Sequence, residues 1–285
     1  MKARLRDVAA ERTDRPAGVG VALPAEEAPV ASSKRASAPP AHPRTAALAN
    51  VLPSTMWARE LLLTLAHPRS VALKLTVPLL LAVPLVAGHA PTFWAGMLLT
   101  VLVAMTGAVG SGVTLARARS SGLLARLAVV PRPPAQTIGA WILAAGAVDT
   151  LQMLPVVAVV IATGPGPLTA LALLACIPAV VLLTNTLGVA LSLLAGGPGE
   201  VLLDVVVVLA PLLFLGGLFT GVPRDGWRWA AARVDPFAYL HSAFTGALGG
   251  TPTFSPAEVL IAAVITAALS LAALAAISRA LLARA

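Results

Sequence analysis

Residue types able to do chemistry are few in this sequence, and their spacing forms no catalytic or metal site. Histidine occurs four times and cysteine once, as Cys176, and none of them has the spacing of zinc ligands. The G-x-x-x-x-G-K-[ST] pattern that binds nucleotide phosphates does not occur. We therefore expect no catalytic residue, no metal site and no cofactor in the chain itself.

The polar residues that stand out lie inside long apolar segments. Asp149 and Gln152 are one helical turn apart in WILAAGAVDTLQMLP, and Asn185 lies in the next apolar segment. A carboxylate at membrane depth is costly, which favours a functional role in a substrate path or as a proton site. The alternative is structural: Asp149 would form a hydrogen bond to Asn185 or Thr184 on a neighbouring helix.

The composition indicates the elements that must position these residues. The 285-residue chain is 58% hydrophobic and only 11% charged, whereas soluble domains carry about 25% charged residues. Its apolar residues form runs about twenty residues long, enough to cross a bilayer as helix. The net charge of +8 comes with no basic stripe interleaved with aromatics, so we expect no nucleic acid partner.

The chain therefore divides into a tail and an all-α, polytopic membrane domain. Residues 1–52 mix Pro, Ala, Ser and both signs of charge, which predicts a disordered cytoplasmic tail. Residues 53–285 contain six predicted membrane-spanning helices. Their expected ranges are about 71–88, 93–115, 135–162, 168–195, 201–218 and 257–278. Lys74, near the start of the first, is expected to extend toward the nearby interface.

A predicted interfacial helix precedes the first span. It begins near Pro53 and ends before Pro68, with Trp57, Leu61 and Leu65 on one side. Such a helix is typical of the bilayer surface.

A cytoplasmic connection between the second and third spans holds four arginines: Arg117, Arg119, Arg126 and Arg132. A serine before Gly122 can cap a short helix that Pro131 ends. Leu123, Leu124, Leu127 and Val130 would share one side of this helix and could face a partner. The simpler interpretation, an orientation signal alone, explains the arginines but not the leucines.

Basic residues in the short flanks predict the orientation. Arg59, Arg69, the connection after the second span and the carboxyl end share one side, so both termini are expected in the cytoplasm. The connection after the fifth span, with Arg224, Arg228 and Arg233, does not fit this rule.

The segment from about residue 219 to 256 is too long for a simple hairpin and too polar to span. Its aromatic residues suit a membrane interface. We expect two short helices, broken near Asp235 and Pro236, that enter the outer leaflet as a re-entrant hairpin. An ordinary amphipathic surface loop is the alternative. The residues of interest are Pro223, Trp227, Trp229, Asp235, Pro236 and Tyr239.

From Met56 onward the chain resembles an ABC-2 type transporter permease, the membrane subunit of an ATP-driven exporter, and its size is most similar to the drug-export branch. SGLLARLAVVPRPP resembles the family's glycine, Arg-Leu and proline pattern in Gly122, Arg126, Leu127 and Pro131. LAPLLFLGGLFTGVP and VDPFAYL resemble a second pattern in Pro211, Gly217, Pro223 and Pro236, although the family's Asn-Pro is Asp235-Pro236 here.

The resemblance implies a separate P-loop ATPase that uses ATP and Mg, and a second permease copy or sister permease. It implies that the ATPase contacts the interfacial helix and the cytoplasmic connection of a multi-pass bacterial plasma-membrane protein. The coupling residues would be Arg59, Glu60, Arg117, Arg119, Gly122, Leu123, Leu124, Arg126 and Leu127.

Uniformly apolar spans favour a hydrophobic or amphipathic substrate, such as a drug, an antibiotic or a lipid-like molecule. Two functions of other classes remain open. One is a secondary transporter that uses Asp149 as a proton or ion site, and the other is a membrane assembly factor without transport activity.

Overall fold

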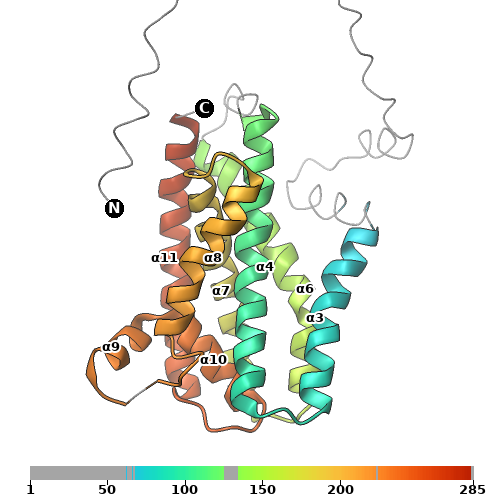
Figure 1. Cartoon of the computed structure of the whole chain (residues 1–285), viewed down its shortest axis with the longest axis vertical. Helices are drawn as coiled ribbons and strands as arrows, with labels where there is room; N and C mark the ends of the chain where they lie inside the picture. The colour runs from blue at the N-terminus through green and yellow to red at the C-terminus, as the bar shows by residue number, and fades with distance from the viewer. Residues whose placement is uncertain (1–61, 63–65, 67, 125–133, 223, 284–285) are drawn as a thin grey trace, which may run out of the picture. The chain divides into compact units, whose positions relative to one another are not determined.

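The computed structural model describes residues 62, 66, 68–124, 134–222 and 224–283, and all the elements within this part of the chain are helices (Figure 1). This confirms the all-α prediction for the described residues. The tail and nearly all of the predicted interfacial helix lie outside them. The helices are α3 (Pro68–Ala87), α4 (Thr92–Ser120), α6 (Pro134–Ile161), α7 (Pro167–Ser192), α8 (Pro198–Leu215), α9 (Gly226–Val234), α10 (Pro236–Ala247) and α11 (Pro256–Ala283).

Proline marks where most of these helices begin. At the first helical position its fixed φ suits the helix, and its missing N–H would have had no partner in the helix. The residue before a proline is kept out of the helical region, which separates each helix from the preceding connection. The prolines in first position are Pro68, Pro134, Pro167, Pro198, Pro236 and Pro256.

Five of the described helices, α4, α6, α7, α8 and α11, are long and apolar enough to cross a membrane. The apolar part of α3, Val71–Ala87, is shorter, so the count of six spans stays a prediction. Large side chains such as Leu80, Val207 and Leu269 are more than half exposed on the outer faces of α3, α8 and α11. Exposed apolar faces of this kind are typical of contact with lipid or with another membrane subunit.

Helices α4 and α7 lie at the centre of the bundle. Helix α4 packs on α7, α10 and α8, whereas α7 also packs on α11 and α6. Glycines allow the close approach: a methyl group at Gly188 would overlap the backbone carbonyl of Ala108, and one at Gly107 would overlap the hydroxyl of Thr184. Between the two helices the Ser111 hydroxyl donates to the carbonyl oxygen of Asn185 at 2.9 Å. Close backbone approach through small residues is the usual basis of helix association in membranes.

Helix α4 extends further than the sequence predicted. Its expected end was Leu115, but it continues to Ser120, so Arg117 and Arg119 lie in its last turn rather than in a connection. The polar residues after Leu115 do not end the helix. Its end is set by Gly122, whose φ of 71° lies in the left-handed region. The Gly122 N–H donates to the carbonyl oxygen of Arg119 at 3.0 Å, as is typical of a glycine helix end.

Candidate functional site

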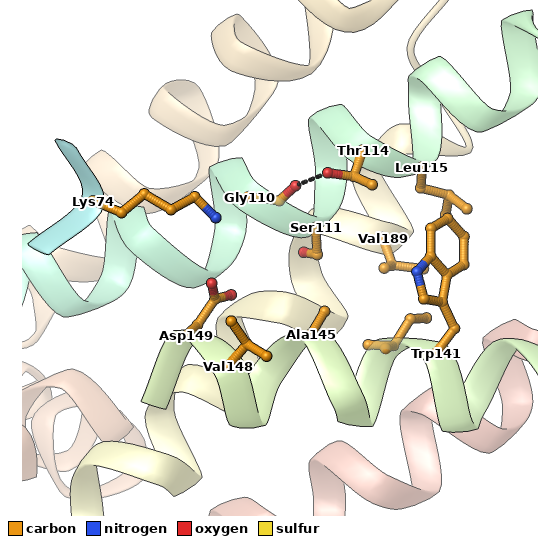
Figure 2. A pocket seen from close by; sticks show the side chains of 11 residues that line it. Lys74, Gly110, Ser111, Thr114, Leu115, Trp141, Ala145, Val148, Asp149 and Val189 are labelled. Carbon is orange, nitrogen blue, oxygen red and sulfur yellow. Dashed lines mark hydrogen bonds between the residues drawn. The ribbon is translucent and has the colours of Figure 1, made fainter. Parts of the chain in front are cut away.

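A cavity of about 120 Å³ with both polar and apolar lining lies among α3, α4, α6 and α7 (Figure 2). Most of its polar groups come from α3, α4 and α6, and Trp141 lies at the far end from Lys74 and Asp149. In the close-up the Lys74 amine extends toward the Asp149 carboxylate. The cavity is lined by Lys74, Gly110, Ser111, Thr114, Leu115, Trp141, Ile142, Ala145, Val148, Asp149 and Val189.

Two helices lie next to the Asp149 carboxylate. On α4, Gly110 is its neighbour: a methyl group there would be in ordinary van der Waals contact with Oδ2, at 3.6 Å. On α7, Asn185 Nδ2 donates to Asp149 Oδ2 at 3.3 Å and to the carbonyl oxygen of Val181 at 2.9 Å. The predicted hydrogen bond between Asp149 and Asn185 is therefore present. Thr184 instead donates to carbonyl oxygens of its own helix.

Sequence reasoning did not place Lys74 near Asp149. We expected it to extend to the nearby interface; its exposed side chain lines the same cavity as Asp149, on the same side of the close-up (Figure 2). Opposite charges that face one cavity attract each other. The available signal was the presence of one cation and one carboxylate in different apolar segments, because charges within membranes usually pair.

Gln152 does not join this group. It lies one turn beyond Asp149 on α6 and is buried, with 6% of its surface exposed, but it does not line the cavity. Among the described residues, neither Oε1 nor Nε2 of its side chain has a hydrogen-bond partner. A buried amide without a partner is unfavourable. The structure thus brings Asp149 and Asn185 together and leaves Gln152 apart from them.

The described part of the predicted coupling segment ends at Leu124. Leu123 is 42% exposed, whereas Leu124 is 3% exposed and packs with Leu115, Ile138 and Leu274. The two leucines therefore differ in their environment instead of sharing one open face. Of this segment's side chains, Leu123 is the apolar one that is open to a partner in the described part of the chain.

Arg119 joins the end of α4 to the end of α7. Its guanidinium donates to the carbonyl oxygen of Ser192 at 2.8 Å and to that of Ala195 at 3.4 Å. A cation at these carbonyls also complements the helix dipole of α7. Arg117 and Arg119 are both exposed on the last turn of α4, and Arg119 makes these contacts within the chain.

The segment after α8 contains two short helices, α9 and α10, that meet at Asp235 as the sequence predicted. Asp235 Oδ1 accepts from the Phe237 N–H at 2.9 Å and so caps α10, where Pro236 is the first residue. Asp235 lies between these short helices, outside the membrane-spanning segments. Burial raises the pKa of Asp235 to about 7, and the hydrogen bond from Phe237 opposes this rise.

The aromatic residues of α9 and α10 have different environments. Trp227 is 69% exposed, whereas Trp229 stacks on Phe254, which also stacks on Tyr239. Helix α10 is tied to α4, since His241 Nε2 lies 3.1 Å from the carbonyl oxygen of Phe93. Exposed tryptophan beside stacked aromatics is typical of a membrane interface. Entry of this hairpin into the membrane stays a prediction.

Comparison with known families shows to which protein family the chain belongs. The sequence profile of the ABC-2 family transporter proteins matches residues 50–277, most of the chain and all of α3 to α10. The chain belongs to the ABC-2 transporter family. Comparison with curated proteins and with solved structures found no match.

As an ABC-2 type permease with apolar helices of membrane length, the chain is a multi-pass membrane protein and a membrane component of a transporter. Such permeases are generally non-catalytic. Among the described residues, no group of three His, Cys, Asp or Glu side chains could hold a metal ion.

Several predicted site residues of this permease lie outside the described residues. They are Arg59 and Glu60 of the predicted interfacial helix, Arg126 and Leu127 of the cytoplasmic connection, and Pro223 before α9. Their roles stay predictions.

Proposed function

We propose that this ABC-2 permease is the membrane subunit of an ATP-driven exporter. A separate P-loop ATPase, which binds ATP and Mg, would dock on the face that carries the end of α4. Two permeases, either identical or sister chains, would form the working unit in a bacterial plasma membrane with their termini in the cytoplasm. The family match over residues 50–277 is the observation that carries this proposal.

The end of α4 is suited to transmit a force from the ATPase. Gly122 directs the chain away from the helix, so a displacement of the following segment would act on the last turn of α4. Arg119 in that turn is hydrogen-bonded to the end of α7. Through this bond the displacement would reach both central helices, α4 and α7. Leu123, exposed beside Gly122, is the described apolar contact for the ATPase.

The substrate we propose is hydrophobic or amphipathic: a drug, an antibiotic or a lipid-like molecule. The described helices expose mainly apolar side chains, which suit a substrate that enters from within the bilayer. The hairpin of α9 and α10 would assist release on the outer side. Asp149 and Asn185 would contribute the few polar contacts along the path, with Gln152 nearby.

Co-purification tests the partner. The tagged full chain is purified in mild detergent as wild type, L123D and L194D, the last being a control with an exposed leucine after α7 at the same end of the bundle. We expect a P-loop ATPase to accompany wild type and L194D and to be lost with L123D. A folded wild-type chain that retains no ATPase would contradict the exporter, and equal loss with L194D would contradict docking at Leu123.

A second function, proton- or ion-coupled transport, is favoured by one observation: a lysine and a carboxylate face the same intramembrane cavity (Figure 2). In that case D149N would abolish transport in proteoliposomes that contain the permease alone. The exporter instead requires the ATPase and ATP in the same assay, so the two functions predict opposite results when the ATPase is omitted.

A further inference from the structure

A groove of about 450 Å³ lies beside α11, at the level where α9 meets α10. One wall is formed by Arg233 and Val234 at the end of α9 and by Pro236 and Tyr239 of α10. The other wall is one side of α11, from Glu258 in the first turn to Leu269. The charged groups and the Tyr239 hydroxyl therefore lie at one end of the groove, and the side of α11 that continues from there is mainly aliphatic, with Thr266 among its lining residues.

The apolar part of the groove has the length of an acyl chain within one leaflet. Ile261, Ile265 and Leu269 recur every four residues on α11, and each is more than half exposed. The twelve residues from Glu258 to Leu269 rise about 16 Å, which is about half of the hydrocarbon thickness of a bilayer. An aliphatic chain that starts beside Glu258 would thus end near the middle of the membrane.

The polar end offers one cation and one anion. The Arg233 side chain is exposed, and its guanidinium has the geometry that binds phosphate through two parallel hydrogen bonds. Glu258 is also exposed and carries the carboxylate. The Tyr239 hydroxyl donates to the Arg233 carbonyl oxygen at 2.8 Å and fixes the end of α9 beside α10.

Two features hold this polar end in place. Tyr239 stacks on Phe254 with ring centroids 4.2 Å apart, so one wall is rigid. Glu258 forms a capping box with Ser255: its Oε2 accepts from the Ser255 N–H and hydroxyl, each at 2.8 Å. The position of the carboxylate is therefore set by the start of α11, while its charge remains available to a ligand.

We propose that this groove binds one phosphatidylethanolamine molecule from the leaflet on the side of α9 and α10. Arg233 would bind the phosphate, Glu258 would bind the ammonium group, and one acyl chain would lie along Ile261, Ile265 and Leu269. A primary ammonium donates hydrogen bonds to a carboxylate, which a quaternary choline cannot do. An anionic glycerol headgroup would place no positive charge at Glu258. The proposal requires only a membrane protein and is independent of the exporter.

Native mass spectrometry of the full chain in detergent tests the site, with phosphatidylethanolamine, phosphatidylcholine and phosphatidylglycerol supplied in equal amounts. We expect wild type to retain one phosphatidylethanolamine with a preference of about fivefold over each competitor. R233Q should remove this preference. The control R224Q changes an exposed arginine that does not line the groove and should leave the preference unchanged.

E258Q provides a second, independent variant. Glutamine can replace glutamate in a capping box, so the start of α11 should be kept while the charge is removed. Because Arg233 then lacks a neighbouring carboxylate, we expect phosphatidylglycerol to become the preferred lipid. Equal retention of the three lipids by wild type, an unchanged preference in R233Q and E258Q, or a loss in R224Q equal to that in R233Q would each overturn the proposal.

Discussion

The interface between α4 and α7 differs sharply from the region where α3 meets α4 and α6. At the first, glycines bring the backbones together until no methyl group can be added at Gly188 or Gly107. At the second, a cavity of about 120 Å³ separates the helices, and Lys74 and Asp149 face it. Helix α3 packs mainly on α6 and much less on α4.

This difference indicates which parts of the permease can move. Helices whose backbones are in contact cannot slide past each other without atomic overlap, because an interface this closely packed has no free space. Helix α3 packs on α6 but little on α4, so it loses few contacts with the central pair when it moves. We infer that α4 and α7 form a centre whose two helices are fixed relative to each other, so that a displacement at the end of α4 moves both, and that α3 is the helix whose position can change relative to this centre.

The largest expected effect is at the fixed centre. G188A places a methyl group against the Ala108 backbone, and overpacking of this kind costs about 1–3 kcal/mol, or roughly 3–10 °C in Tm. Thermal unfolding of the purified protein measures it. The control G199A, where the structure has open space, should leave Tm unchanged or slightly higher. Equal Tm values for G188A and wild type would contradict a fixed centre.

A second prediction concerns the two charges across the cavity. K74Q and D149N should each lower Tm, because each removes one of two opposite charges that face the same cavity. The double variant should lose less than the sum, with a coupling of about 0.5–3 kcal/mol. The control pair is K74Q with D204N. The Asp204 carboxylate does not line the cavity, so the effects of K74Q and D204N on Tm should add. Additive effects of K74Q and D149N would show that the two charges do not interact.

The third prediction concerns Asp235, which unlike Asp149 faces no lysine in the described part of the chain. Its pKa is set by burial and by the hydrogen bond from Phe237. The pKa of Asp235 rises from 3.8 to about 7 on burial. The folded state therefore binds the Asp235 proton more tightly than the unfolded state does. The stability that this proton contributes is lost as the pH rises from about 4 to 7. We expect the free energy of unfolding to fall by about 1–3 kcal/mol over this range.

D235N should remove this dependence, because asparagine is neutral and can still cap α10. The difference between the Tm curves of wild type and D235N isolates Asp235, since His241 and the other titrating groups are common to both. Parallel curves would contradict the raised pKa.

The smallest expected effect is at Arg119. R119Q removes the hydrogen bonds to the end of α7 and should cost about 0.5–1.5 kcal/mol, measured as a small fall in Tm. R117Q, on the same turn, should have no effect on stability. A matching fall in R117Q would mean that charge on this turn, and not the bond to α7, stabilises the bundle.

Much of the helical arrangement could be predicted from local features. Prolines at first positions and apolar runs gave the helices within a few residues, and the break before Pro236 was predicted because Asp and Pro suit a helix start. The hydrogen bond between Asp149 and Asn185 was also foreseen as one of two alternatives, because a carboxylate at membrane depth requires a partner.

Features that depend on distant segments were missed or stayed open. The hydrogen bonds from Arg119 to carbonyl oxygens at the end of α7 could not be read from the sequence, whereas the continuation of α4 to Ser120 has a local signal in Gly122 that was missed. The direction of Lys74 depends on a cavity formed by other helices. The burial of Leu124 beside exposed Leu123 depends on Ile138 and Leu274, which are far away in the sequence.

The sequence by itself determined that this chain is helical, apolar enough to cross a membrane and a member of the ABC-2 family, because these properties depend on composition, periodicity and short local patterns. Tertiary structure alone decided which polar groups meet. Lys74 and Asp149 face one cavity, and Arg233 and Glu258 line one groove, because helix packing brings segments distant in the sequence into contact.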